Sequence, residues 1–228
     1  MSAGLRAVVF DFDGLILDTE VPVYAAWCAA FEAHGAAPPT IEEWSVEIGT
    51  AGGIDLEAWL MERATLPVDL DAMHEARRAH RDELLEREQV RAGVEAWIDE
   101  AEAAGLGVAI ASSSPSEWVV DHLERLAMRH RFRPVVTAGG ELRGKPAPDT
   151  YLDACARLGV DPADALAIED SPHGIAAAKA AGLRCVAVPN PITEVLDLSA
   201  ADLRLASLGD CTLADVVARL EAGEDHAS

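Results

Sequence analysis

Short apolar segments that stop at polar or acidic residues recur along the chain and constrain its fold more than any other feature. They are AVVF at 7–10, LGVAIA at 106–111, PVVTA at 134–138, ALAI at 165–168 and CVAV at 185–188. Runs of this kind are typical of strands that are buried on both faces. Helical patterns lie between them, at 94–104, 117–130, 149–158 and 174–181. The alternation predicts right-handed strand–helix–strand units and therefore an α/β, Rossmann-like parallel sheet in a three-layer α/β/α core.

The interval from residue 19 to residue 89 breaks this alternation. It has no good strand candidate and only helical pieces, at 21–34, after a capping box of Thr40 and Glu43, at 55–64 and at 69–88. The sequence therefore predicts two domains. A discontinuous α/β core comprises 1–18 and 90–228, and a helical cap domain at 19–89 is inserted after the first strand.

The charge of the chain disfavours some partners. Its 228 residues include 18 Lys and Arg against 40 Asp and Glu, a formal net charge of -22, which argues against nucleic acid and anionic membranes. The four cysteines form no CxxC pair, and no apolar segment reaches the roughly 20 residues of a membrane-spanning helix. The first residues do not resemble a signal peptide. We expect a soluble, cytoplasmic protein whose oligomeric state the sequence leaves open, with a monomer compatible.

Polar side chains follow several of the predicted strands where they end. In an open parallel sheet, ligands bind beside the carboxyl ends of the strands. This rule brings together Asp11, Asp13, Ser112, Ser113, Ser114, Gly144, Lys145, Glu169 and Asp170. Carboxylates that converge on one point repel each other unless a cation lies between them, and a set of oxygen ligands favours Mg²⁺ over zinc or copper. We therefore predict a magnesium site at this edge.

A metal beside a lysine favours phosphate as the bound ligand. The hydroxyl and N–H groups of Ser112 and Ser113, near the start of a helix, suit phosphate oxygens, and Lys145 adds a positive charge. With phosphorus held in this way, a carboxylate can attack it and form an aspartyl-phosphate. The acid two positions further on points to the same side of an extended chain. It can donate a proton to the leaving oxygen and later take one from water.

Four motifs in this order resemble the haloacid dehalogenase (HAD) superfamily, in its phosphatase and β-phosphoglucomutase-like branch. They are DFDGLILDTE, ASSS, GKPAPD and IEDSPHGIAAAKAAGL, and the similarity extends over most of residues 7–190. The resemblance implies a hydrolase of phosphoric monoesters. It implies Asp11 as the nucleophile, Asp13 as the acid/base, Ser112 as a phosphate ligand and Lys145 as the lysine that neutralises charge.

The same resemblance implies the metal ligands and the substrate class. Mg²⁺ would be bound by Asp11, the backbone carbonyl of Asp13 and Asp170, with Glu169 as a direct or water-mediated ligand. Asn190 lies where members of the superfamily often close the site. The implied substrate is a small phosphorylated metabolite, such as a sugar phosphate or phosphoglycolate, and movement of the helical cap would close the site around it.

Neighbouring branches of the superfamily fit the sequence less well. Haloalkanoate dehalogenases lack the metal and a counterpart of Asp13. Phosphonatases use a cap lysine, and residues 19–89 contain no lysine. β-Phosphoglucomutases carry a histidine early in the helix after DT and an arginine in a cap loop; this chain has Pro22 and Val23, and IGTAGG in the loop. Hydrolysis is therefore preferred, with a sugar phosphomutase as the alternative and a non-catalytic phosphometabolite-binding protein as a remote one.

Each motif also has a purely structural interpretation. The acids after the first strand could simply end it, and a serine of ASSS could cap the following helix. Lys145 could lie in a surface turn. Glu169 and Asp170, ahead of Ser171 and Pro172, could form an acidic helix start that favours the helix dipole. Only the convergence of these residues at one sheet edge favours a functional site.

The remaining notable side chains are expected to be structural. Tryptophans of the helical interval are predicted to form its core rather than to stack on substrate, and its arginines to lie on a solvated helix face. These residues are Trp27, Trp44 and Trp59, and Arg63, Arg77, Arg78 and Arg81. His173 is expected near the rim of the site in a structural role.

Overall fold

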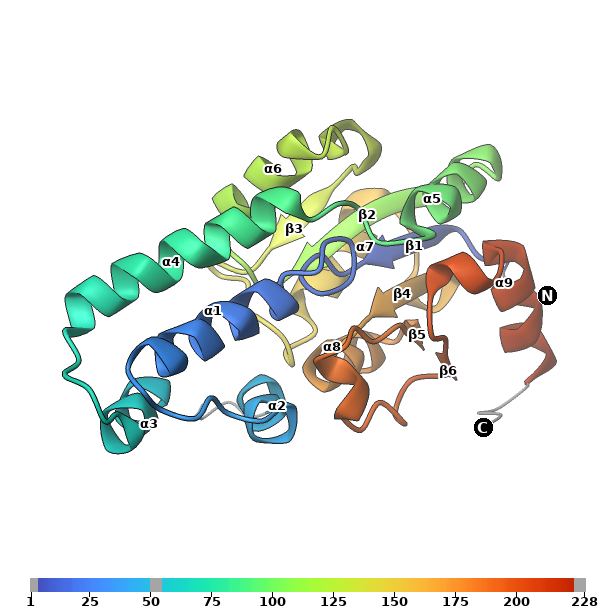
Figure 1. The fold of residues 1–228 in the computed structure, drawn as a ribbon. Helices are drawn as coiled ribbons and strands as arrows, with labels where there is room; N and C mark the ends of the chain where they lie inside the picture. The colour runs from blue at the N-terminus through green and yellow to red at the C-terminus, as the bar shows by residue number, and fades with distance from the viewer. Residues whose placement is uncertain (1–3, 50–54, 224–228) are drawn as a thin grey trace.

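A six-stranded parallel sheet in the order β3-β2-β1-β4-β5-β6 forms the centre of the computed structural model, which describes residues 4–49 and 55–223 (Figure 1). The strands are β1 (Ala7–Phe10), β2 (Gly107–Ser112), β3 (Val135–Thr137), β4 (Ala165–Glu169), β5 (Arg184–Ala187) and β6 (Leu203–Arg204). The central strand, β1, pairs with β2 on one side and β4 on the other, so that Phe10 is opposite Ile110 and Ile168. Its carboxyl end is therefore flanked by the carboxyl ends of two neighbours.

Helices cover both faces of this sheet because alternate residues of a strand point to opposite faces. The helices are α5 (Val94–Ala103), α6 (Ser116–Arg125) and α9 (Leu213–Ala222) on one face and α7 (Asp149–Leu158) and α8 (Pro172–Ala181) on the other. Val8 and Phe10 belong to the buried apolar cluster on the first face, and Ala7 and Val9 to the cluster on the second. This arrangement confirms the predicted three-layer α/β, Rossmann-like fold.

Four of the five helices described between β1 and β2 precede α5, and we call residues 20–87, which contain them, the helical insertion. They are α1 (Glu20–Ala33), α2 (Ile41–Gly49), α3 (Leu56–Arg63) and α4 (Leu70–Arg87). Figure 1 shows α1 and α4 side by side at one end of the molecule. The predicted capping box is confirmed, since the Thr40 N–H donates to Glu43 Oε2 over 2.9 Å and the Glu43 N–H to Thr40 Oγ1 over 3.2 Å. Of the predicted loop IGTAGG, at 48–53, the first two residues end α2 and residues 50–53 lie outside the described residues.

The insertion supplies most of a further apolar cluster, which Ile192 of the loop after β5 completes. Trp27 and Trp44 are buried in it, and Trp59 packs against it, as predicted. The prediction of a solvated arginine face is right only in part. Arg78 is exposed, but the Arg77 guanidinium lies 4.6 Å from the centroid of the Trp27 ring, a favourable cation–π geometry. Part of the positive charge that the sequence pattern places in solvent therefore lies against an aromatic ring.

The two connections between the insertion and the sheet lie next to each other. Leu17 pairs with Val90 in an antiparallel bridge. The guanidinium of Arg91 then donates to the backbone carbonyl of Gly14, and also to that of Pro189 over 2.7 Å. Arg91 thereby ties the end of the insertion to the loop after β1 and to the loop after β5.

Some elements differ from the prediction. The helix expected at 117–130 ends at Arg125, because the chain turns at Ala127, whose φ is 56°. The short strand β6 and the helix α9 were not predicted. Four 3₁₀ turns complete the described chain: η1 (Arg129–Arg131), η2 (Pro162–Asp164), η3 (Thr193–Val195) and η4 (Leu208–Asp210). Among the helices of residues 4–49 and 55–223, none combines the length and the apolar composition that a membrane crossing requires.

Candidate active site

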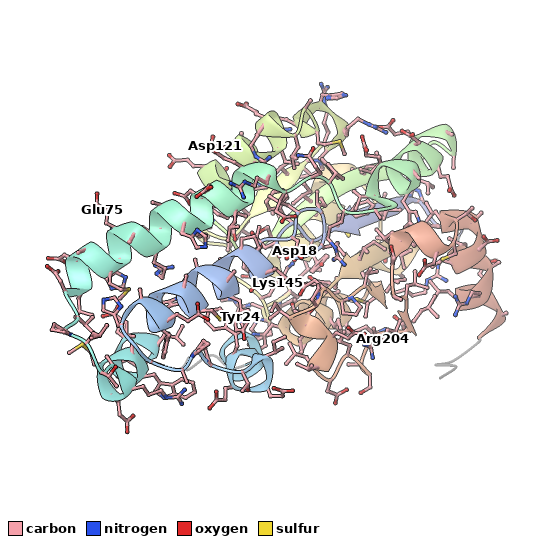
Figure 2. The ribbon with its side chains drawn as sticks, viewed as in Figure 1. Asp18, Tyr24, Glu75, Asp121, Lys145 and Arg204 are labelled. Atoms are coloured by element: carbon pink, nitrogen blue, oxygen red, sulfur yellow. The ribbon has the colours of Figure 1, made fainter. Side chains whose placement is uncertain are left out.

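A pocket of about 210 Å³ opens at the carboxyl ends of the strands. It is lined by Asp11, Asp13, Glu20, Ser112, Ser113, Ser114, Lys145, Asp170, Ser171 and His173. Figure 2 shows Lys145 near the start of α1, whose first residue, Glu20, lines the same pocket. Every residue predicted for catalysis or phosphate binding therefore borders one cavity, and His173 lies at it as expected.

Lys145 is buried at the centre of this arrangement. Its side chain is only 6% exposed, and its ammonium donates to the carboxylate of Asp11 and to Glu169 Oε1, the latter over 2.6 Å. The hydroxyl of Tyr151 donates to the same Glu169 oxygen over 2.6 Å. Lys145 does lie in a turn, but the interpretation that places its side chain at the surface is wrong, and Tyr151 is a partner that the sequence reasoning missed.

Three buried carboxylates converge beside this lysine. Oxygens of Asp11, Glu169 and Asp170 lie within 4.8 Å of one another. Burial raises the pKa of Asp11 to about 8, despite the opposing charge of Lys145. Burial and the charges of Asp11 and Glu169 raise the pKa of Asp170 well above its ordinary value. One ammonium balances only part of this negative charge, so the oxygen-rich donor set fits a hard divalent cation such as Mg²⁺.

Close packing holds two of these acids in place. Asn190 Nδ2 donates to Asp170 Oδ2 over 2.8 Å, consistent with its expected place at the edge of the site. A Cβ on Gly174, at the start of α8, would lie 1.9 Å from Glu169 Oε2, so the helix approaches this acid as closely as it does only because residue 174 is glycine. Neither Glu169 nor Asp170 belongs to the helix, which Ser171 caps through the Gly174 N–H. The helix begins at Pro172, as the structural interpretation has it, but no acid lies in its first turn, so the part of that interpretation that gives the helix an acidic start is wrong.

The carboxylate of Asp13 has a different environment. Ser114 Oγ donates to its Oδ2 over 2.6 Å, and the indole N–H of Trp118 donates to its Oδ1 over 2.8 Å. Ser112 Oγ lies 3.4 Å from Oδ2. The serines of this motif do not cap α6, whose N-cap is Pro115 without a side-chain hydrogen bond. The side chain of Asp13 lies outside the group of three carboxylates, so the predicted role of its backbone carbonyl in metal binding stays a prediction.

The predicted phosphate ligand Ser113 also contacts the motif that contains Lys145. Ser113 Oγ accepts from the backbone N–H of Lys145 over 2.9 Å, so the second serine links two motifs.

Glu20 brings a carboxyl group of α1 into the pocket. Burial, followed by the charges of Asp13 and Asp18, raises the pKa of Glu20 to about 7. The sequence reasoning missed Trp118 and Glu20. The local signal for Trp118 is its place four residues after the serine motif, and the signal for Glu20 is its place at the end of DFDGLILDTE.

Known proteins resemble this chain over most of its length. The YhcW protein of Bacillus subtilis is 40% identical over 210 residues, which are 92% of this chain and 95% of that protein. Hexitol phosphatase B of Escherichia coli is 29% identical and covers 93% of this chain and 97% of its own length. The crystal structure of CbbY from Rhodobacter sphaeroides in complex with phosphate superimposes with a TM-score of 0.69 at 30% identity, over 92% of this chain and 98% of that one. A second structure of that protein holds xylulose 1,5-bisphosphate.

The family comparison covers most of the chain. Residues 5–182 match the haloacid dehalogenase-like hydrolases, and residues 142–223 match a second HAD-hydrolase-like group. The predicted enzyme class, a HAD-like phosphoric monoester hydrolase, is confirmed. The matched region contains the lysine, the serines and the acids that line the pocket. The chain belongs to the haloacid dehalogenase-like hydrolase family.

Proposed function

We propose that the protein is a Mg²⁺-dependent phosphatase that hydrolyses a small phosphorylated sugar or related metabolite through an aspartyl-phosphate on Asp11. The observation that carries this proposal is the buried contact of Lys145 with Asp11 and Glu169, next to Asp170. Two relatives support the substrate class, since one is named a hexitol phosphatase and the other was crystallised with a sugar bisphosphate.

The chain's own residues supply the steps of hydrolysis. Asp11 attacks phosphorus while Lys145 offsets the negative charge that collects there, and Ser112 and Ser113 donate to phosphate oxygens. Asp13 gives a proton to the leaving oxygen and later takes one from the attacking water. Asp11, Asp170, Glu169 and the backbone carbonyl of Asp13 would hold the metal. When bound, Mg²⁺ lowers the repulsion between the nucleophile and the phosphate.

The helical insertion has a proposed role in substrate choice. We assign residues 19–89 to a cap domain and residues 1–18 and 90–228 to the core. Glu20 brings the insertion to the edge of the pocket, so movement of the cap would admit the metabolite and then exclude water. The proposed partner is this metabolite alone, because the net charge of -22 disfavours nucleic acid and anionic membrane.

The test is phosphate release from a panel of phosphorylated metabolites, with and without Mg²⁺. We expect metal-dependent release by the wild type and a loss of more than about a thousandfold in Asp11→Asn. The matched control is Asp121→Asn, the same change at an exposed aspartate of α6, labelled in Figure 2. Its activity should equal that of the wild type. Full activity in folded Asp11→Asn would refute the assignment of the nucleophile.

A sugar phosphomutase remains the alternative, and one assay separates it from the phosphatase. The enzyme is incubated with glucose 1-phosphate and a bisphosphate activator, and the products are glucose 6-phosphate for a mutase or free phosphate for a hydrolase. We expect no isomerised product, because Pro22, which takes the place of the mutase histidine, is buried in α1 and offers no group to a second phosphate.

A further inference from the structure

The acid/base proposed above is held by a residue that none of the motifs contains. Trp118 lies in the first turn of α6, and its indole N–H donates to Asp13 Oδ1 over 2.8 Å. The other oxygen, Oδ2, is contacted by Ser114 Oγ over 2.6 Å and lies 3.4 Å from Ser112 Oγ. The two oxygens of one carboxylate therefore have chemically different partners.

The difference matters because an indole nitrogen can only donate a hydrogen bond, whereas a hydroxyl can donate or accept. Oδ1 must keep a lone pair directed at Trp118 in every protonation state. A proton on Oδ2 is compatible with its neighbours, because the Ser114 hydroxyl can rotate and accept. Oδ2 is also the oxygen beside Ser112, the proposed phosphate ligand. The proton that leaves Asp13 is thus placed on the side where the phosphate binds.

The indole itself is fixed by neighbours from two parts of the chain. The ring of His122, one helical turn further along α6, lies 4.4 Å from the Trp118 ring in an edge arrangement. On another side, the guanidinium of Arg81 lies 5.7 Å from the ring centroid. Arg81 belongs to α4 of the helical insertion, is partly exposed and pairs with Asp82, so the prediction of a solvated face is right only in part for this residue. An indole held in this way can keep its N–H aimed at one oxygen.

We propose that Trp118 is a positioning residue for proton transfer, which keeps Asp13 Oδ1 as an acceptor so that the transferable proton resides on Oδ2. The inference rests on the proposed function of Asp13. In the first step the bond between Asp11 and phosphorus forms, the ester P–O bond breaks, and the leaving oxygen takes the Oδ2 proton. In the second step water attacks phosphorus, its proton goes to Oδ2, and the bond to Asp11 breaks to release inorganic phosphate.

The experiment compares two substrates in the complete protein with Mg²⁺. The first is the sugar phosphate that the panel ranks highest, whose alkoxide leaving group needs a proton. The second is p-nitrophenyl phosphate, whose phenolate leaves with little help. We expect Trp118→Phe to lower kcat/KM for the sugar phosphate about tenfold more than for p-nitrophenyl phosphate, the range for a hydrogen bond to a charged group. This ratio does not depend on the fraction of folded enzyme, since unfolding removes both activities equally.

Two further variants make the result decisive. Trp97→Phe removes an equivalent indole N–H, which donates to the backbone carbonyl of Leu208 in the core, and should change both activities by the same factor. Asp13→Asn should show the same selective loss as Trp118→Phe, but a larger one. If Asp13→Asn is selective and Trp118→Phe is not, the role of Trp118 is overturned while the proposed function stands. If Asp13→Asn itself is not selective, the acid/base assignment fails and the inference fails with it.

Discussion

The α/β core and the helical insertion both bury apolar residues, but they place charged groups in opposite ways. The core encloses Asp11 and Glu169 at the ends of β1 and β4, which pair with strands on both sides, and Lys145 reaches these acids from a turn before α7. The insertion keeps most of its charges exposed and covers aromatic rings with arginines such as Arg77. The strand ends and the loops that follow them thus hold the groups of the candidate site, while the helices of the insertion border it. The two regions differ in whether their charged groups are enclosed or exposed to solvent.

Replacing Lys145 by Met should have the largest effect and would reveal how much the core depends on its buried charge. The change leaves Asp11 and Glu169 buried without their cation, and breaking a buried pair in this way costs about 3 to 5 kcal/mol. We expect the free energy of unfolding in urea, without Mg²⁺, to fall by this amount, and phosphatase activity to be lost.

The control for this variant is Lys179→Met. Lys179 pairs with Asp202 at the surface, where both side chains are about one third exposed, and such pairs contribute about 0 to 1 kcal/mol. Equal losses of stability in the two variants would show that burial of the Lys145 cluster does not set it apart from a surface ion pair.

Leu60→Ala should have an intermediate effect, confined to the insertion. Leu60 is fully buried in the apolar cluster of the insertion, and truncation of such a leucine costs about 2 to 5 kcal/mol. We expect amide hydrogen exchange to accelerate in α1, α3 and α4, while the amides of β1 and β4 keep their protection. Uniform acceleration throughout the chain would show instead that the proposed cap and core unfold as one unit.

The smallest effect is expected at Glu20, the acid of the insertion that borders the pocket. Burial, with the charges of Asp13 and Asp18, raises its pKa from 4.5 to about 7 in the folded protein. The folded state therefore binds a proton between these pH values that the unfolded chain releases, and the stability associated with this group is lost as the pH rises through about 7. Glu20→Gln should be more stable than the wild type by about 1 kcal/mol at pH 8, since the side chain is partly exposed.

At pH 4.5 most of this difference should be gone, because Glu20 is then protonated in the folded state and half protonated in the unfolded chain. The measurement is urea unfolding at both pH values. A stability difference that does not change with pH would contradict the raised pKa of Glu20.

Sequence reasoning succeeded where a residue's position follows from its own strand. The apolar run before Asp11 and the run before Glu169 placed these acids at one sheet edge without knowledge of any contact. It failed for Trp118 and Tyr151, which lie on helices and reach acids 105 and 18 residues away. Helical periodicity indicates the buried face of such a helix, but the partner of one side chain depends on how the helix packs in three dimensions. The strand β6, with two residues, was too short to produce a pattern.

The bridge between Leu17 and Val90 has a consequence for protein engineering. The chain departs from the sheet layer and returns to it at adjacent residues, so both covalent connections of the intervening segment lie together, although the segment also contacts Ile192 and Trp118 of the core. A different helical segment could be joined at these residues without changing the register of β1, provided that it also packs against Ile192 and Trp118. Leu17 and Val90 are therefore suitable junctions for exchanging the segment with that of another family member, and such an exchange would test the proposed role of the insertion in substrate choice.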